Sequence, residues 1–161
     1  MRKWIRLLLI LWMGSRVAPS NAQVFVDVNT PAPPGSRDGL SWTTAFENLQ
    51  DAFDVATTQA VWVAEGTYTN SATYTLSIDG TEVLGGFTNG MMSAAERDPA
   101  VHRSMLDGEH ARRVLQVSAS DCILDGLTMA NGFVTNGGSG GGILYDDTTD
   151  LGNFTLRDCV I

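Results

Sequence analysis

Lysine is almost absent from this chain of 161 residues: Lys3 is the only one, and it lies in a basic N-terminal stretch. From residue 23 onward, six arginines stand against eighteen acidic residues, which gives this part a net charge of −12. Nucleic-acid binding requires clustered cations against phosphate, so the composition disfavours nucleic acid as a partner. An acidic, lysine-free exterior fits an exported protein that binds cations or neutral glycans, and equally a charged surface that serves only solubility.

The chain also lacks an apolar run of the roughly 20 residues that a membrane-spanning helix needs. Its longest run, Leu7–Met13, follows basic residues and precedes Ser20-Asn-Ala22, small residues at the positions that determine signal cleavage. A basic start, a short apolar run and small residues are typical of a secretory signal peptide. We therefore predict a signal peptide over residues 1–22 and one exported domain over residues 23–161.

Sequence motifs of common enzyme classes are missing. There is no Gly-x-Ser-x-Gly phrase of a serine hydrolase and no phosphate-binding P-loop. The two histidines, His102 and His110, have no acid or cysteine at metal-ligand spacing, which disfavours a zinc site. Arg112 and Arg113 are adjacent, so in a strand their side chains point to opposite faces and at most one could act as a base. The sequence therefore assigns no catalytic residue and no resident cofactor to this segment.

A short phrase recurs in the C-terminal part of the chain, at Ser104–Gly108, Cys122–Met129 and Phe154–Ile161. In the middle copy the apolar alternation is carried by Leu124 before Gly126 and by Leu127 after it. In one regular strand, side chains at every second position share a face, so positions 124 and 127 would point to opposite faces. Because both are apolar, the sequence predicts two short strands that meet at a bend, where Gly126 takes the unusual backbone angle. Laying Leu156 over Leu124 preserves the apolar pattern, as stacked strands require.

The only two cysteines are Cys122 and Cys159. An exported protein with two cysteines favours a disulfide. The repeat alignment favours free, buried thiols instead, because it places Cys122 over Phe154 and Cys159 over Leu127, in different columns of the stack. The sequence leaves the pairing open.

One amphipathic helix is predicted over Ser41–Thr57. Its apolar residues recur at spacings of three and four, and Thr44 with Glu47 has the spacing of a capping box. The rest of the chain consists of short β-rich runs bounded by Gly, Asn or Asp, and residues 91–103 form a polar loop. Without a second helix for crossovers a doubly wound sheet is disfavoured, and we expect a solenoid whose open end the helix covers.

Several phrases carry a family resemblance: Phe25-Val-Asp27, Ser41-Trp42, Leu49-Gln-Asp-Ala52, Val61-Trp-Val-Ala-Glu-Gly-Thr-Tyr68, Gly85-Gly-Phe87, Leu106-Asp-Gly108, Leu124-Asp-Gly-Leu-Thr-Met129 and Gly140-Gly-Gly-Ile143. In this order they resemble the N-terminal part of secreted bacterial proteins with a pectate-lyase-like fold, including those similar to polymorphic outer membrane proteins. The resemblance covers residues 23–161. It implies an all-β fold, a right-handed parallel β-helix with an N-terminal capping α-helix, secreted or displayed on the cell surface.

The function implied by the resemblance is a structural or adhesive scaffold that binds a polysaccharide or a host or cell-surface glycan. The alternative is a polysaccharide lyase or glycoside hydrolase whose catalytic turns lie beyond Ile161. Because the chain stops inside a predicted strand, we expect it to be truncated at its C-terminus, with further turns of the same chain to follow.

Two groups of acidic residues are candidate sites. If the repeated phrases stack in register, Asp107, Asp125 and Arg157 form an outward column with neighbours about 4.8 Å apart. Two such carboxylates suit the acid and nucleophile of a retaining glycosidase or a Ca²⁺ site. Alternatively, Asp-Gly marks only a corner and the arginine offsets the repulsion between the acids.

The second group is Asp146, Asp147 and Asp150, which are spaced as Ca²⁺ ligands but lack the glycine and bidentate glutamate of an EF-hand loop. A solvated turn is the alternative. Three aromatic residues, Trp42, Trp62 and Tyr68, suit either a sugar-stacking platform or core packing, and their periodicity favours the core.

Overall fold

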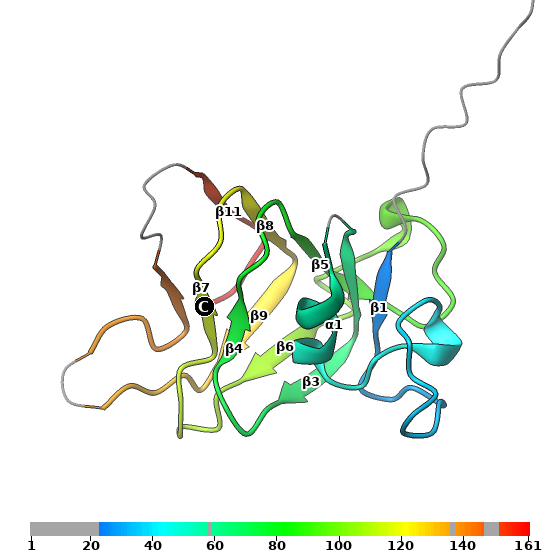
Figure 1. Cartoon of the computed structure of the whole chain (residues 1–161), viewed down its shortest axis with the longest axis horizontal. Helices are drawn as coiled ribbons and strands as arrows, with labels where there is room; N and C mark the ends of the chain where they lie inside the picture. Colours follow the sequence, from blue (N-terminus) through cyan, green and yellow to red (C-terminus); the bar gives the residue numbers. More distant parts are fainter. Residues whose placement is uncertain (1–22, 58, 136–137, 147–151) are drawn as a thin grey trace, which may run out of the picture.

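The computed structural model describes residues 23–57, 59–135, 138–146 and 152–161, and these form a predominantly β structure (Figure 1). Parallel strands make up three sheets. The first sheet contains β1 (Val24–Val26), β2 (Val61–Ala64), β5 (Glu82–Phe87), β8 (Cys122–Asp125) and β11 (Phe154–Arg157). The second contains β3 (Gly66–Thr69), β6 (Ser104–Asp107) and β9 (Leu127–Ala130), and the third β4 (Tyr74–Leu76), β7 (Leu115–Val117) and β10 (Ile143–Tyr145).

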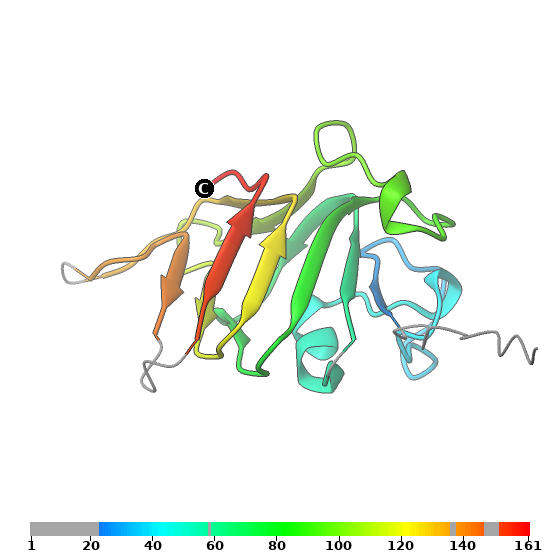
Figure 2. The same ribbon diagram turned by 90° about the horizontal axis from the view of Figure 1, so that it is seen from above.

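From β2 onward the chain visits the three sheets in a constant cyclic order. The strands β2, β3 and β4 lie in the first, second and third sheet, and each pairs in parallel with the strand three places later in the chain. Figure 2 shows the strands of the first sheet side by side, from β1 in blue to β11 in red. This order confirms the predicted predominance of short parallel strands and is compatible with a parallel β-helix.

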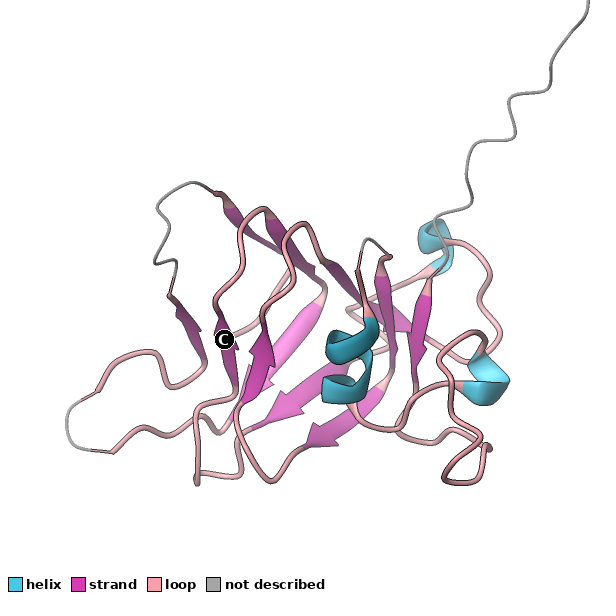
Figure 3. Cartoon of the chain, viewed as in Figure 1, coloured by secondary structure: helices cyan, strands magenta, loops and turns pink. Residues whose placement is uncertain are grey.

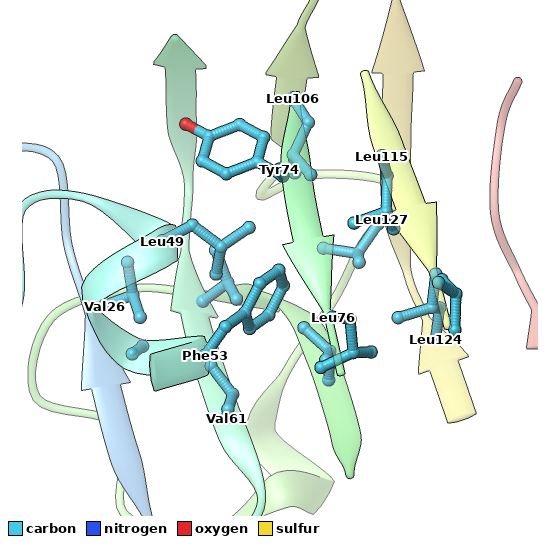
Figure 4. Close-up of a cluster of buried hydrophobic side chains, with 14 of the residues drawn as sticks. Val26, Leu49, Phe53, Val61, Tyr74, Leu76, Leu106, Leu115, Leu124 and Leu127 are labelled. Atoms are coloured by element: carbon cyan, nitrogen blue, oxygen red, sulfur yellow. The ribbon is translucent and has the colours of Figure 1, made fainter. Parts of the chain in front are cut away.

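An apolar cluster fills the space between the three sheets (Figure 4). Leu124 from the first sheet, Leu106 from the second and Leu76 from the third are each completely buried. Burying a leucine side chain contributes about 1.5–3 kcal/mol, so the cluster supplies the main driving force for bringing the sheets together. The alternation of buried and half-buried residues along β6 and β9 follows from the period of two in a strand.

The predicted register of the last two repeats is confirmed. Leu156 lies opposite Leu124, Arg157 lies opposite Asp125, and Gly126 takes a φ of +72° at the bend between β8 and β9. Leu124 is fully buried whereas Leu156, in the edge strand β11, is 42% exposed.

The first repeat was placed wrongly by the sequence. Ser104–Asp107 pairs with Leu127–Ala130 of the second sheet and not with Cys122–Asp125 of the first. In β8 the phrase Leu-Asp-Gly leads into the bend, which lies at Gly126. In β6 the same phrase follows the bend, because the chain has already turned at Gly86, before β6 begins. An identical tripeptide therefore occupies two different places in the cycle.

The helix is shorter than predicted. It is α1 (Leu49–Val55), seven residues long, and Asn48 is its N-cap, with the side-chain oxygen accepting from the Gln50 backbone N–H. A separate 3₁₀ turn, η1 (Trp42–Thr44), precedes it, and Phe46 forms a bridge with Val26. The predicted helix is therefore confirmed over Leu49–Val55 only. Its expected bounds at residues 41 and 57 and its capping box at residue 44 are wrong, because strand pairing overrides helical periodicity before residue 48.

The helix lies beside β4, at the β1 end of the sheets (Figure 3). Its side chains Leu49 and Phe53 are buried in the central cluster. The Gln50 amide accepts from the Thr75 backbone N–H over 2.8 Å and donates to the Thr75 carbonyl over 3.0 Å. One side chain thus satisfies the outer edge of β4, which would otherwise present unpaired backbone groups.

Candidate functional site

The bend between the first and second sheets repeats along the molecule and organises the candidate site. Its turns use positive φ angles at Gly66, Gly86, Gly126 and Asp158. Such angles are strained for residues with a Cβ atom, which explains three glycines in this column and an aspartate as the tolerated exception.

The loop of residues 88–103, which joins β5 to β6 and contains the 3₁₀ turn η2 (Ala94–Glu96), covers this bend. The Arg97 Nη2 lies 2.8 Å from the Asp125 Oδ2, and the Asp98 backbone N–H donates to the Gly86 carbonyl over 2.9 Å. The side chains of the ion pair are only 18% and 8% exposed. Pro99 packs on the bend so closely that a Cβ on Gly126 would lie 2.5 Å from its Cγ. The loop is therefore clamped by charge and by packing.

A cavity of about 480 Å³ lies between this loop and the last turn of the chain. Its polar lining side chains are Asp98, Arg103, Thr128 and Asp158, and its apolar lining includes Pro99, Cys159 and Val160. Asp98, Arg103 and Asp158 are exposed, so their charged groups are accessible. The cavity combines a guanidinium donor, carboxylate acceptors and a hydroxyl with an apolar wall.

Both cysteines are free thiols, as the repeat alignment favoured. Cys122 is buried, and Cys159 is half-buried at the cavity, with its Sγ 3.5 Å from the Leu124 carbonyl oxygen. Burial raises the pKa of both thiols, so they remain protonated at neutral pH and are poor nucleophiles.

The structure brings only part of the predicted column Asp107, Asp125 and Arg157 together. Asp125 and Arg157 are register partners in the first sheet, but Asp107 lies in the second sheet, opposite Ala130. Asp125 is buried against Arg97 and not exposed as predicted. Asp107 and Asp125 therefore do not form the side-by-side carboxylate pair expected for a retaining glycosidase.

Asp107 is held within its own turn. Its carboxylate accepts from the Glu109 backbone N–H over 2.7 Å and from the Asn131 side-chain amide over 3.0 Å. These hydrogen bonds, with the charge of His110, keep the pKa of Asp107 below its usual value. The residue therefore stabilises a corner in its ionised form.

Of the three acidic residues predicted to bind Ca²⁺ after β10, the structure describes only Asp146. Asp146 is exposed directly after β10, while Asp147 and Asp150 lie outside the described residues. Among the residues that the structure describes, no three His, Cys, Asp or Glu side chains are grouped as they would be around a metal ion. His102 contacts Glu65 over 2.8 Å.

The aromatic side chains pack against one another. Trp62 stacks on Phe87 with ring centroids 4.5 Å apart, and Trp42 meets Phe25 edge-on at 4.8 Å. Both tryptophans are 5% exposed, and Tyr68 is 1% exposed in the central cluster, where burial raises its pKa. These residues support the fold and present no open face for a sugar ring.

The sequence did not predict the Arg97–Asp125 ion pair or the cavity beside the 88–103 loop. The polar character of residues 91–103 was visible, but nothing local to Arg97 identifies Asp125, 28 positions later, as its partner. Within the described ranges, no helix combines the length and apolar character needed to cross a membrane.

Comparison of the chain with protein-family models, curated proteins and solved structures gave no match. The resemblance to secreted β-helix proteins is therefore carried by its sequence phrases, and the parallel β architecture is compatible with it.

Proposed function

We propose that the three sheets are the sides of a right-handed parallel β-helix that is exported as a structural or adhesive scaffold and binds a glycan in the cavity at the bend. The cyclic order of the strands, the repeated bend and the apolar core between the sheets support a β-helix. The basic and apolar start of the chain supports export.

The cavity carries the glycan assignment. Sugar hydroxyls both donate and accept hydrogen bonds, and Arg103 and Asp158 supply a donor and an acceptor for them at one opening. Pro99 and Val160 provide apolar surface for the C–H face of a sugar ring. A volume of about 480 Å³ is within the range of small-ligand sites and suits a short oligosaccharide.

The charge of the site favours a neutral glycan over an anionic one. Two carboxylates, Asp98 and Asp158, line the cavity with a single guanidinium, and the chain from residue 23 onward carries a net charge of −12. An anionic chain would meet like charge at the opening and in the surroundings, which disfavours its approach.

Isothermal titration of the purified protein with a panel of neutral and acidic oligosaccharides tests this function. Arg103→Ala and Asp158→Asn should each weaken binding of a neutral oligosaccharide by about tenfold or more, since hydrogen bonds to charged groups are worth about 1.5–3 kcal/mol. Asp51→Asn, an exposed acid on α1, is the matched control and should bind normally.

Two results would contradict the proposal: no binding to any member of the panel, or binding that neither cavity variant changes. New reducing ends released from a polysaccharide would instead support the alternative of a lyase or hydrolase.

A further inference from the structure

Oxygen-bearing side chains converge where three adjacent parallel strands of the first sheet end. Asp27 directly follows β1, Glu65 directly follows β2, and Asn89 lies two residues beyond β5. Together with Asn29 they line a cavity of about 230 Å³, separate from the one proposed to bind glycan. The carboxyl ends of neighbouring parallel strands meet at one edge, which is why residues far apart in sequence are gathered here.

Asp27 is a buried carboxylate that lacks a counter-charge. It is 4% exposed, and within the described part of the chain no arginine or histidine forms an ion pair with it. Its Oδ1 accepts from the Asn29 backbone N–H over 2.8 Å, but its Oδ2 is met only by the Asn89 side chain at 3.4 Å. Buried charges in proteins are normally paired or coordinate a metal, so a cation in this cavity would supply the counter-charge that the hydrogen bonds do not.

We infer that this cavity is a Ca²⁺ site in which Asp27 and Glu65 provide carboxylate oxygens and Asn29 and Asn89 provide amide oxygens. All four side chains offer hard oxygen ligands, the kind that Ca²⁺ prefers and zinc does not. Glu65, Asn29 and Asn89 are exposed, so the ion reaches the buried carboxylate from solvent.

The contacts present leave ligand atoms available. His102 Nδ1 contacts the Glu65 Oε2 over 2.8 Å, and no described residue forms a hydrogen bond with the other oxygen of that carboxylate. The oxygen and nitrogen of an asparagine amide are assigned from its hydrogen bonds, so a turned Asn89 presents its oxygen beside Asp27. The Asn89 Nδ2 lies 3.4 Å from the Asp27 Oδ2. Two oxygens bound to one Ca²⁺ at about 2.3–2.6 Å are separated by roughly this distance, so the turned amide would place its oxygen suitably.

Only two carboxylates take part, so the remaining ligands are amides and water. Because the ligands carry little negative charge, we expect the site to bind Ca²⁺ weakly compared with other protein sites, with a Kd of about 10⁻⁴–10⁻³ M. Mg²⁺ requires near-ideal octahedral geometry and gives up its water reluctantly, so it should bind more weakly here.

Calorimetric titration of the EDTA-treated, dialysed protein with CaCl₂ and with MgCl₂ tests the site, with Tb³⁺ luminescence as a second readout. Glu65→Gln should weaken Ca²⁺ binding by about tenfold, and because this side chain is 52% exposed the variant should unfold normally in EDTA. Asp27→Asn should weaken binding further. Asn89→Ala is a second exposed variant if Asp27→Asn does not fold.

Asp51→Asn is the matched control, since it removes an exposed carboxylate on α1, outside both acidic groups that the sequence offers as Ca²⁺ ligands. It should leave the Kd unchanged. The inference fails if the protein binds no Ca²⁺ at millimolar concentration, or if Glu65→Gln and Asn89→Ala both bind Ca²⁺ with the Kd of the wild type. Neither result depends on glycan binding.

Discussion

Replacing Arg97 by methionine is expected to destabilise the protein strongly. The guanidinium is the ion-pair partner of the Asp125 carboxylate, and among the described residues the Asp125 Oδ1 has no hydrogen-bond partner. Because the Asp125 side chain is 8% exposed, the variant leaves a buried charge that neither water nor protein neutralises. Removing one member of a buried pair costs about 3–5 kcal/mol.

The lower figure of about 3 kcal/mol applies here, since Arg97 itself is 18% exposed. For a chain of this size that corresponds to a fall in Tm of about 6–12 °C. Urea unfolding of the wild type, Arg97→Met, Asp125→Leu and the double variant measures the coupling between the two side chains.

The double variant should recover most of the stability lost in Arg97→Met, because replacing both charges by apolar groups removes the unpaired carboxylate. Binding at the neighbouring cavity should weaken in Arg97→Met, since the 88–103 loop is released from the bend. An Arg97→Met variant within 0.5 kcal/mol of the wild type, a margin typical of roughly neutral surface changes, would refute the reasoning.

Four further substitutions, one of them a control, test other parts of the structure. Gly126→Ala should cost about 2 kcal/mol or more in urea unfolding, because its φ is +72° and the new Cβ would meet Pro99; Gly80→Ala, with a φ of +71° and nothing within 4 Å, should cost only about 1 kcal/mol, and equal losses would show that the contact is unimportant. Gln50→Ala should cost about 0.5–1.5 kcal/mol, because it removes two hydrogen bonds at an exposed edge of β4 where water can replace them, and it should speed amide exchange in β4; unchanged exchange would argue against this role. Tyr74→Phe should be neutral or stabilising, because the hydroxyl is buried without a partner. Burial raises the pKa of Tyr74 to about 12, so wild-type stability should fall as the pH rises from about 10 toward 12, and a titration in which Tyr74→Phe shows the same fall would contradict this origin.

Much of the β architecture could be predicted from local pattern. The parity shift at Gly126, the alignment of Leu156 with Leu124 and the separation of the two cysteines follow from two facts, the alternation of side chains along a strand and the need of stacked strands for matching apolar positions. These constraints act between residues a few positions apart, or between copies of one phrase, and a sequence displays both.

The bounds of the helix could not be predicted from local sequence pattern. Residues 41–48 have helical periodicity, yet Phe46 pairs with Val26 and Trp42 packs on Phe25 at the first sheet. A seven-residue helix survives only where its apolar face reaches the central cluster. Short isolated helices are marginal in water, so packing decides their length.

Only the tertiary structure decided which charged groups meet. It separated Asp107 from Asp125, buried Asp125 under Arg97, and gathered Asp27, Glu65 and Asn89 at one corner. The physical reason is that each turn of the chain adds tens of residues between side chains that end up in contact, and charge pairing depends on distance in space. Composition and periodicity record which face of a strand is apolar, whereas the partner of a polar group is set by how the turns are stacked.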